Sequence, residues 1–565
     1  MSVEKFWLKS YDKHVPETLT YSNDDVGTAL SKAMNRFPDR IACHFMDYAM
    51  TYKELMELSQ IFASFLQKNG LKKGDVVSVN LANMPQYLIA VFGTYLAGGT
   101  VAGCSPLLSA DEMAFQLNDS SAKFLVTMDI IYAKRMPQIL DNLPKLEVII
   151  PTNISEYMGF SSFKVFMGKL IKKIPKGKMN PWPGKKIVPF QEVMTTPIDI
   201  KKVEIDPKKD LALIQYTGGT TGTPKGTEIT HFNWIANMHQ FDVWLKREIG
   251  TDVVLCAFPY FHIAGFFVGL FLTYISASSI IIANPRDTDH IIHEMIDKKI
   301  TVFGNVPTLF LMVQSNPKSK EIPDEILDNI TLYVSGAAPF PAEAVRDFEK
   351  DFHSANKFVE VYGMTETAVL ATVNPALGKK KIGSVGLPLP DTEIKLVDVE
   401  TGEQVELGNP GEVLIKGPQV ARGYHNKPDA TAVTFTEGWI HTGDVGIFDE
   451  EGYLRIVDRT KDMLSVSGFK VYSVHVEDVM TKHPDIQLMA IIGLPDKDRP
   501  GSEIVKAVIQ LKEGIEASDK VKENIKKFAQ ENLAKYEVPK QWDFRDELPL
   551  TSIGKVLKRA LREEK

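Results

Sequence analysis

A run of glycines and threonines ending in a lysine is the part of this chain best suited to bind phosphate. It comprises Thr217, Gly218, Gly219, Thr220, Thr221, Gly222, Thr223, Pro224, Lys225 and Gly226. Glycines let the backbone N–H groups approach a phosphate, threonines add hydroxyl donors, and a lysine adds a mobile positive charge. Because the apolar stretch 211–216 directly precedes the run, we expect a strand that leads into a phosphate-binding loop.

This loop differs from the Walker A loop of common ATPases. The Walker motif has a glycine, four further residues and then Gly-Lys-Ser/Thr, whereas Lys225 follows Pro224 and precedes Gly226. The mismatch favours an enzyme that releases AMP and pyrophosphate. A plain P-loop ATPase, which releases ADP and phosphate, stays as an alternative.

Alternating strands and helices are expected to position the loop. Short Val/Ile/Leu runs alternate with helical patterns through the first 390 residues, which predicts doubly wound α/β layers. From about residue 383, short strands broken by Gly and Pro predict a β-rich module, and the chain after residue 460 alternates strands and helices again. Strands are expected at 76–80, 123–127, 146–150, 211–216, 253–257 and 300–303, with a helix at 84–95.

The composition excludes several classes of protein. A chain of 565 residues is too long for one core and should form at least two domains. The net charge of −7 argues against a nucleic-acid partner, which would require a basic surface. Cys43, Cys104 and Cys256 are widely spaced, which predicts buried structural thiols in a reducing compartment. Without a recognisable signal peptide or peroxisomal address, the cytoplasm is the expected location.

Two segments raise the question of a membrane. Residues 253–285 contain no Asp, Glu, Lys or Arg and are long enough to span a bilayer. Prolines, glycines and serines divide this stretch, so a buried helix followed by a buried parallel strand is the preferred interpretation. A membrane-anchored transporter is the alternative, from a different class of function.

The second segment, 157–191, contains eight lysines and no acidic residue. Its apolar residues at helical spacing are Phe163, Phe166, Met167, Leu170, Ile171 and Ile174, with Lys164, Lys169, Lys172 and Lys173 between them. A basic amphipathic helix of this kind suits peripheral contact with an anionic membrane. We prefer the alternative that its apolar face packs against its own domain and the lysines are solvated.

Together with Tyr216, the loop resembles the signature of the adenylate-forming superfamily, which includes acyl-CoA synthetases, firefly luciferases and peptide-synthetase adenylation domains. Further segments are similar to the family's other motifs and occur in the same order. They are 51–55, 261–265, 336–339, 362–367, 411–415, 438–444, 458–462, 467–472 and 551–555. The ordered set covers residues 50 to 560 and is far more specific than any one motif.

The resemblance implies a fold, an activity and a set of cofactors. The fold is α/β, with a large N-terminal domain (1–460) of doubly wound subdomains plus a β-rich module, and a small mobile α+β C-terminal domain (461–565). The activity is attack of a carboxylate on the α-phosphorus of ATP, followed by transfer of the acyl group to coenzyme A. ATP, Mg²⁺ and coenzyme A are the implied cofactors, and a dimer is an open alternative to a monomer.

The resemblance also implies roles for single residues in the first step. Lys555 would contact the carboxylate and the α-phosphate, and Thr365 would donate to the α-phosphate. Glu366 would bind Mg²⁺, for which a carboxylate oxygen is a suitable hard ligand. His262 would lie beside the substrate carboxylate, and Phe266 near the mouth of an acyl tunnel.

The nucleotide and the thiol have their own implied contacts. Tyr362 would face adenine opposite the segment Gly336, Ala337, Ala338 and Pro339. Asp444 and Arg459 would contact the ribose. The C-terminal domain would rotate about Lys461 and bring Ser467 and Gly468 to the pantetheine chain. Ser473 and His475 replace a proline and a glutamate that are common in the family, which leaves open how the following helix is anchored.

Fatty acids of medium to long chain are the favoured substrates, because the basic insertion at 157–191 resembles segments of bacterial and archaeal long-chain fatty-acid CoA ligases. An aryl acid such as coumarate is the alternative. A stand-alone amino-acid adenylation domain is less favoured, since His262 stands where such domains usually carry an aspartate for the amine. Luciferase-type oxygenation is not separated from ligation by these motifs.

Overall fold

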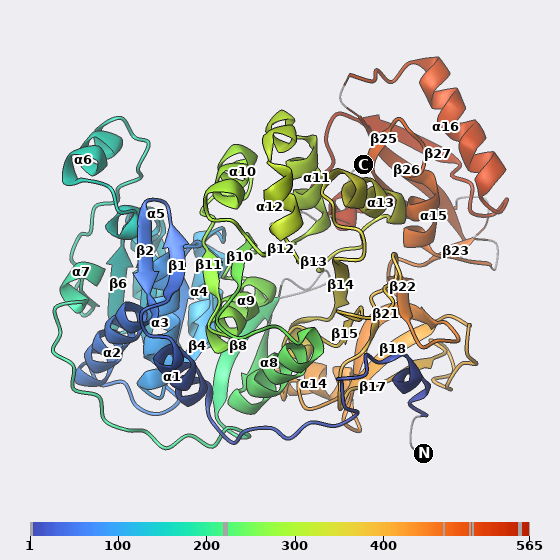
Figure 1. Ribbon diagram of the computed structural model, residues 1–565. Coiled ribbons are helices and arrows are strands. Elements are labelled where there is room, and N and C mark those ends of the chain that lie inside the picture. The colour runs from blue at the N-terminus through green and yellow to red at the C-terminus, as the bar shows by residue number, and fades with distance from the viewer. Residues whose placement is uncertain are drawn as a thin grey trace.

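The computed structural model describes residues 4–217, 224–466, 469–496, 499, 502–512, 514–551 and 556–563. Figure 1 shows two helix-covered sheets at the left and centre, a β-rich module at the lower right and a smaller C-terminal region at the upper right. This arrangement agrees with the predicted order of α/β layers, β-rich module and small α+β region.

Sheet I carries the strand that leads into the phosphate loop. Its strand order is β19-β9-β8-β4-β3-β5-β6-β7, and the stretch from β8 to β7 is parallel. The strands are β3 (Val76–Asn80), β4 (Thr100–Gly103), β5 (Phe124–Met128), β6 (Val148–Thr152), β7 (Lys186–Ile187), β8 (Leu211–Thr217), β9 (Lys225–Thr230) and β19 (Gly423–Tyr424). The strands β8 and β9 pair antiparallel and flank the loop.

Sheet II lies beside sheet I and has the order β16-β15-β14-β13-β12-β10-β11-β1-β2. Its strands are β1 (Ile41–Phe45), β2 (Tyr48–Thr51), β10 (Val253–Cys256), β11 (Ser278–Ile280), β12 (Val302–Asn305), β13 (Leu332–Ser335), β14 (Phe358–Tyr362), β15 (Thr372–Val373) and β16 (Leu387–Pro388). The stretch from β14 to β1 is parallel. Parallel strands are buried on both faces, which explains their continuous apolar sequences.

Helices cover both faces of these sheets (Figure 1). They are α1 (Val26–Arg36), α2 (Tyr52–Lys68), α3 (Pro85–Leu96), α4 (Ala110–Asp119), α5 (Asp129–Ile139), α7 (Phe190–Val193), α8 (His231–Leu245), α9 (Ile263–Tyr274), α10 (Thr288–Asp297), α11 (Pro307–Ser315), α12 (Asp324–Asn329) and α13 (Ala342–Asp351), whereas α6 (Ser162–Leu170) projects away from the sheets. The buried side chains of α8 and α9 belong to the main core, whereas those of α10 to α13 pack in a second core on the other face of sheet II.

The β-rich module and the C-terminal region complete the described structure. The module contains β17 (Glu393–Val397), β18 (Gly411–Lys416), β20 (Phe435–Thr436), β21 (Trp439–Phe448), β22 (Leu454–Arg459) and the helix α14 (Pro428–Thr434). The C-terminal region contains β23 (Leu464–Val466), β24 (Phe469–Val471), α15 (Ser473–Met480), β25 (Ile486–Pro495), β26 (Glu503–Leu511), α16 (Asp519–Asn532), β27 (Gln541–Arg545) and α17 (Lys558–Glu563). This region has its own apolar core, as expected of a separate small domain.

The uncharged stretch 253–285 folds inside the protein, as predicted. It forms β10, the buried helix α9 and the buried strand β11, and β10 and β11 pair in parallel. Across the described residues, every helix is too short or too polar to cross a bilayer. The predicted strands and the predicted helix at 84–95 are also present, with ends displaced by at most two residues.

The preferred interpretation of the basic insertion is wrong. The helix α6 projects from the body (Figure 1, upper left), and none of its side chains is buried. Exposure reaches 74% for Phe163, 62% for Phe166 and 64% for Leu170. Of the predicted apolar face only Ile174 is buried, and it lies beyond the end of the helix. Apart from Ile174, the large apolar side chains of this face are therefore left exposed by the described residues.

Candidate active site

A continuous cavity of about 3500 Å³ opens at the carboxyl ends of the strands of sheet II and extends toward the C-terminal region. Its lining includes predicted site residues that are far apart in sequence. They are Thr217, Lys225, His262, Gly336, Ala337, Ala338, Tyr362, Thr365, Glu366, Asp444 and Arg459. Open α/β sheets bind ligands at this edge, so the fold brings the motifs together where a ligand would lie.

The residues predicted for the ribose form one hydrogen-bonded group. The hydroxyl of Tyr362 donates to Oδ2 of Asp444 at 2.8 Å, and Nε of Arg459 donates to Oδ1 of the same carboxylate at 2.7 Å. Asp444 and Arg459 face each other across the antiparallel pair β21–β22. Burial raises the pKa of the Tyr362 hydroxyl well above its usual value, so this group stays a neutral donor at physiological pH.

Thr365 and Glu366 lie in a short 3-10 turn after β14, and both are buried. The hydroxyl of Tyr424, on β19, donates to Oε1 of Glu366 at 2.6 Å. Burial raises the pKa of the Glu366 carboxyl, and the bond from Tyr424 opposes that rise by stabilising the charged form. A buried carboxylate held by one donor at the edge of the cavity fits an Mg²⁺ ligand.

Sequence reasoning missed Tyr424, which contacts two of the predicted groups. Besides its bond to Glu366, its ring lies 4.8 Å from Nζ of Lys225, in a cation–π arrangement. The two neighbours are separated from it by 58 and 199 residues in sequence, so no local pattern marked this tyrosine. It joins the lysine of the phosphate loop to the carboxylate predicted to bind metal.

Unusual backbone conformations cluster around the same edge. Ala337 and Val369 have φ of 68° and 103°, in a region that residues other than glycine rarely occupy. The carbonyl of Val369 contacts Gly363 so closely that a side chain at Gly363 would collide with it. Glycine is therefore required directly between Tyr362 and the turn that carries Thr365.

His262 stands at the start of α9, half-buried, and its Nδ1 accepts a hydrogen bond from the N–H of Ala264 at 3.3 Å. A ring nitrogen that accepts in this way caps the helix. The side chain also lines the cavity, so the residue lies where the resemblance places a group near the substrate carboxylate.

An apolar extension of the cavity, called the arm below, lies between one face of sheet II and the helices α8 and α9. On the sheet side the arm is lined by alternate residues, Val254 and Cys256 of β10, Val302 and Gly304 of β12, and Leu332 and Val334 of β13. On the helix side it is lined by Phe241 and Leu245 of α8 and by Phe267, Val268, Phe271 and Leu272 of α9. The residues between the lining positions of the strands point to the opposite face, because side chains alternate along a strand.

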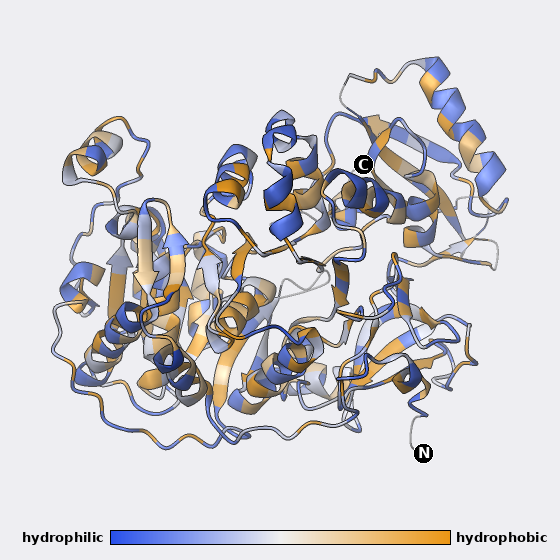
Figure 2. Cartoon of the chain, in the orientation of Figure 1, coloured by the Kyte–Doolittle hydropathy of each residue, from blue (hydrophilic) through white to orange (hydrophobic). Residues whose placement is uncertain are grey.

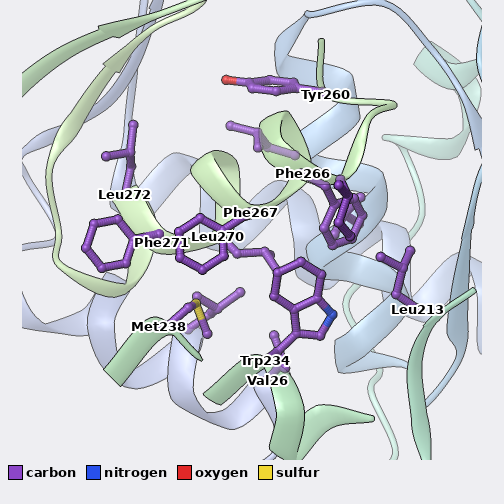
Figure 3. Close-up of a cluster of buried hydrophobic side chains, with 14 of the residues drawn as sticks. Val26, Leu213, Trp234, Met238, Tyr260, Phe266, Phe267, Leu270, Phe271 and Leu272 are labelled. Atoms are coloured by element: carbon purple, nitrogen blue, oxygen red, sulfur yellow. The ribbon is translucent and has the colours of Figure 1, made fainter. Parts of the chain in front are cut away.

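The interpretation of Phe266 as a tunnel residue is wrong. Phe266 is buried against Trp234 and Tyr87, with ring centroids 5.4 and 6.3 Å away, and the neighbouring Phe267 lines the arm instead. Figure 3 shows these aromatic side chains of α9 packed around Trp234 and Met238 of α8. Successive helical residues differ by about 100° in direction, and the apolar sequence of α9 does not indicate which of them faces a cavity.

Ionic contacts anchor the start of α15. The N–H and hydroxyl of Ser473 both donate to Asp458, and Nζ of Lys558 donates to the Ser473 hydroxyl at 2.7 Å. Lys558 also pairs with Glu477 at 2.7 Å. These contacts show how the helix is held where the usual proline is replaced by Ser473.

Several predicted site residues lie outside the described residues. They are Gly218, Gly219, Thr220, Thr221, Gly222, Thr223, Ser467, Gly468 and Lys555. Their predicted roles stay predictions. Lys461, predicted as the hinge, is described and lines the cavity; burial and the nearby Arg459 lower the pKa of its ammonium.

Comparisons with known proteins agree with this geometry. The chain is 35% identical to a long-chain-fatty-acid–CoA ligase of Bacillus subtilis and 36% identical to one of Escherichia coli, covering 100% of this chain in both cases and 99% and 98% of those proteins. The crystal structure of the anthranilate CoA ligase AuaEII shares the fold, with a TM-score of 0.84, 24% identity and 97% of each chain covered.

Family models match both parts of the sequence. The model described as the AMP-binding enzyme C-terminal domain matches residues 475–555, which lie within the predicted small domain. The model described as AMP-binding enzyme matches residues 30–425, more than half of the chain. The protein therefore belongs to the AMP-binding enzyme family.

Proposed function

We propose that the protein is an AMP-forming acid–thiol ligase that converts a fatty acid to its acyl-CoA thioester. The observation that carries the proposal is one continuous cavity with two parts. A polar part is lined by the residues predicted to bind ATP, and it opens into the apolar arm between sheet II and helices α8 and α9. ATP, Mg²⁺ and coenzyme A are the cofactors of this reaction. The full-length relatives named long-chain-fatty-acid–CoA ligase support a fatty acid as the substrate.

In the first step the fatty carboxylate attacks the α-phosphorus of ATP, forming acyl-adenylate and releasing pyrophosphate. Two anions must meet, so cations and donors around the phosphates are the main requirement. Lys225, Thr217 and the loop they flank would hold the phosphates, and Thr365 would donate to the α-phosphate. Mg²⁺ bound at Glu366 would neutralise part of the developing charge.

The nucleoside would add its contacts to the existing hydrogen-bond group. Asp444 is placed to accept from the ribose hydroxyls, with Arg459 holding its other oxygen. Tyr362 would face adenine from one side, and Gly336, Ala337 and Ala338 would face it from the other. The hydroxyl of Tyr362 donates to Asp444. The residue that would face adenine and the residue that would bind the ribose are therefore held together by a hydrogen bond.

In the second step the thiol of coenzyme A attacks the acyl carbon and AMP leaves. We propose that the C-terminal domain from residue 461 rotates about Lys461, withdraws Lys555 and brings Ser467 and Gly468 to the pantetheine chain. One linker residue can absorb such a motion. The contacts between Asp458, Ser473 and Lys558 link the two sides of this boundary.

Separate half-reactions test the role of Lys555. Lys555→Ala is expected to abolish pyrophosphate release from ATP and a fatty acid, while thioester formation from supplied acyl-adenylate and coenzyme A is preserved. Normal adenylation by this variant would refute the role. A Lys527→Ala variant, which removes only an exposed ion pair with Glu531 on α16, serves as the control for folding of the C-terminal region.

The substrate class is tested by pyrophosphate release across saturated acids from C2 to C18, with benzoate and coumarate included. We expect the largest kcat/KM for medium- to long-chain acids. A preference for an aryl acid would support the alternative suggested by the fold it shares with anthranilate CoA ligase. A preference for an amino acid would overturn the proposal.

We also propose that α6 brings the protein into peripheral contact with an anionic membrane from the cytoplasmic side. The segment is held at its ends, where the N–H of Asp47 donates to the carbonyl of Met158 and the amide of Asn153 donates to the carbonyl of Pro175. Between these anchors the helix exposes large apolar side chains beside lysines. Exposed apolar side chains next to cations match the interface of an anionic bilayer.

Vesicle flotation tests this contact. Wild-type protein is expected to bind phosphatidylglycerol vesicles at low salt and phosphatidylcholine vesicles weakly, and Phe166→Ser/Leu170→Ser should lose binding without a change in unfolding temperature. Absence of wild-type binding at low salt would refute membrane contact. If a second copy covers the helix instead, sedimentation would show a dimer that the double variant converts to monomer.

A further inference from the structure

The sheet side of the apolar arm consists of two rows of side chains that cross three strands. Strand register places Cys256, Gly304 and Val334 side by side in the row nearer the nucleotide end. The deeper row consists of Val254, Val302 and Leu332. The rows are two residues apart along each strand, which corresponds to about 7 Å.

Gly304 occupies the middle of the nearer row, and the backbone does not require a glycine there. Its φ is outside the left-handed region, and an added Cβ would lie 3.6 Å from Sγ of Cys256 and 3.8 Å from Cβ of Val334, which are ordinary contacts. The other glycines around the site, such as Gly363 and Gly336, do meet close neighbours at the position of a Cβ. The missing side chain at Gly304 therefore widens the arm and does little else for the fold.

The far end of the arm is polar. Its lining reaches Arg247 and Asp252, which form a two-pronged ion pair. The hydroxyl of Thr301 donates to the same carboxylate at 2.7 Å, and Arg40 donates to the backbone carbonyl of Asp252 at 2.8 Å. A satisfied ion pair offers no apolar surface to an alkyl chain, so it marks the depth limit of the arm.

We propose that Gly304 is the residue that sets acyl chain length. Because no side chain stands in the middle of the nearer row, an alkyl chain can pass between sheet II and α9 to the deeper row and end near the Arg247–Asp252 pair. The inference rests on the proposed fatty-acid ligase function, and it adds which residue admits long chains. Residues that touch only the apolar chain change specificity without taking part in the chemistry.

Blocking the arm at two depths tests the proposal. Gly304→Val should block the nearer row, so that kcat/KM for palmitate falls at least about 100-fold while kcat/KM for hexanoate changes less than about 3-fold. Leu332→Phe should block only the deeper row, so that octanoate is retained and palmitate is lost. The two variants are thus expected to give two different cut-offs, the shorter one for Gly304→Val.

Matched variants separate this effect from damage to the fold. Gly304→Ala adds only the Cβ that fits, and should change the chain-length profile little. Phe303→Leu alters the neighbouring residue, which packs in the core on the opposite face of sheet II, and should leave the profile unchanged. If Gly304→Val does not fold, the smaller Gly304→Ser replaces it and is expected to lower kcat/KM for palmitate relative to hexanoate in the same direction, by a smaller factor.

An unchanged profile in folded Gly304→Val, or equal cut-offs for Gly304→Val and Leu332→Phe, would overturn the proposal. Failure of the wild-type protein to release pyrophosphate with any fatty acid would instead overturn the proposed function. The two outcomes can be told apart, because a chain-length profile of the variants can be measured only if the wild-type enzyme is active on fatty acids.

Discussion

The apolar arm of the cavity and the apolar face of α6 use the same kinds of side chain in opposite settings. Phe267 in the arm is 3% exposed, whereas Phe166 on α6 is 62% exposed. The arm is enclosed between a parallel sheet and two helices, and Figure 2 shows the apolar residues of that core in orange. The large apolar side chains of α6 are left exposed by the described residues, although they lie on one face of an amphipathic helix.

The difference separates apolar surface that the protein's own side chains cover from apolar surface that is left exposed to an external partner. Burying a side chain of this size contributes about 1.5–3 kcal/mol, and Phe267 obtains this from Trp234, Phe241 and Phe271. Phe166 obtains none of it from the protein itself. A large apolar side chain left in water next to lysines is therefore a candidate for an external surface, not a contributor to stability.

The same substitution on the two surfaces tests this distinction most strongly. Phe267→Ala is expected to lower the free energy of unfolding by about 3–5 kcal/mol, because it removes a buried ring from the core. Phe166→Ala should change it by less than about 0.5 kcal/mol. Urea denaturation of both variants checks the difference. Equal losses would mean that α6 packs against the protein in solution.

The other face of sheet II carries a buried carboxyl whose titration should be visible. Burial raises the pKa of Glu360, which faces away from the arm, to about 8, although its carboxylate accepts from the N–H of Gly383. Between its ordinary pKa and pH 8 the folded state holds a proton that the unfolded state has released, so stability falls as pH rises through that window, by up to about 1.4 kcal/mol per pH unit.

Glu360→Gln should remove this slope while keeping an acceptor for Gly383. Denaturation at pH 5, 6.5 and 8 measures it. Glu343→Gln, an exposed residue paired with Arg346 on α13, is the control and should keep the wild-type slope. If Glu360→Gln also keeps the slope, Glu360 is charged in the folded protein.

The affinity of the predicted Mg²⁺ site at Glu366 is expected to depend on Tyr424. Tyr424→Phe removes the donor to Glu366, and a hydrogen bond to a charged group contributes about 1.5–3 kcal/mol, so kcat/KM should fall about 10- to 100-fold at limiting Mg²⁺. The concentration of Mg²⁺ that gives half-maximal activity should rise, and titration calorimetry with Mg·ATP should show weaker binding.

Tyr453→Phe is the matched control for Tyr424→Phe. The hydroxyl of Tyr453 donates to the backbone carbonyl of Lys379 at 2.6 Å, away from the cavity lining. Its loss should leave the Mg²⁺ dependence unchanged. A Tyr424→Phe enzyme with normal Mg²⁺ dependence would mean that Tyr424 does not position Glu366.

The smallest predicted effect concerns the charges beside α6. Lys172 and Lys173 are exposed just after the helix, and each lysine near an anionic surface contributes about 1 kcal/mol. Lys172→Ala/Lys173→Ala should therefore weaken binding to phosphatidylglycerol vesicles roughly 10- to 30-fold and reduce its salt dependence. Unchanged binding would assign the contact to the apolar face alone.

Sequence reasoning succeeded where structure depends on local pattern. Strands such as Val76–Asn80 and Leu211–Thr217 lie within one residue of their predicted ranges, because a short apolar run between turn residues is a local signal. The order of motifs identified the family, and the cavity brings together the described residues of those motifs. The prediction for Phe266 is wrong because nearly every position of α9 is apolar, and which of them faces the cavity depends on packing against neighbouring segments.

The sequence by itself determined the family, the alternation of strands and helices, and the motif residues that could meet ATP, because each is encoded in contiguous residues. Only the tertiary structure decided that Tyr424 joins Lys225 to Glu366, that Gly304 leaves a gap on the sheet side of the apolar arm, and that the large apolar side chains of α6 stay exposed among the described residues. Each of these depends on which distant segments pack together, and packing between segments separated by tens to hundreds of residues leaves no periodic signal in the chain.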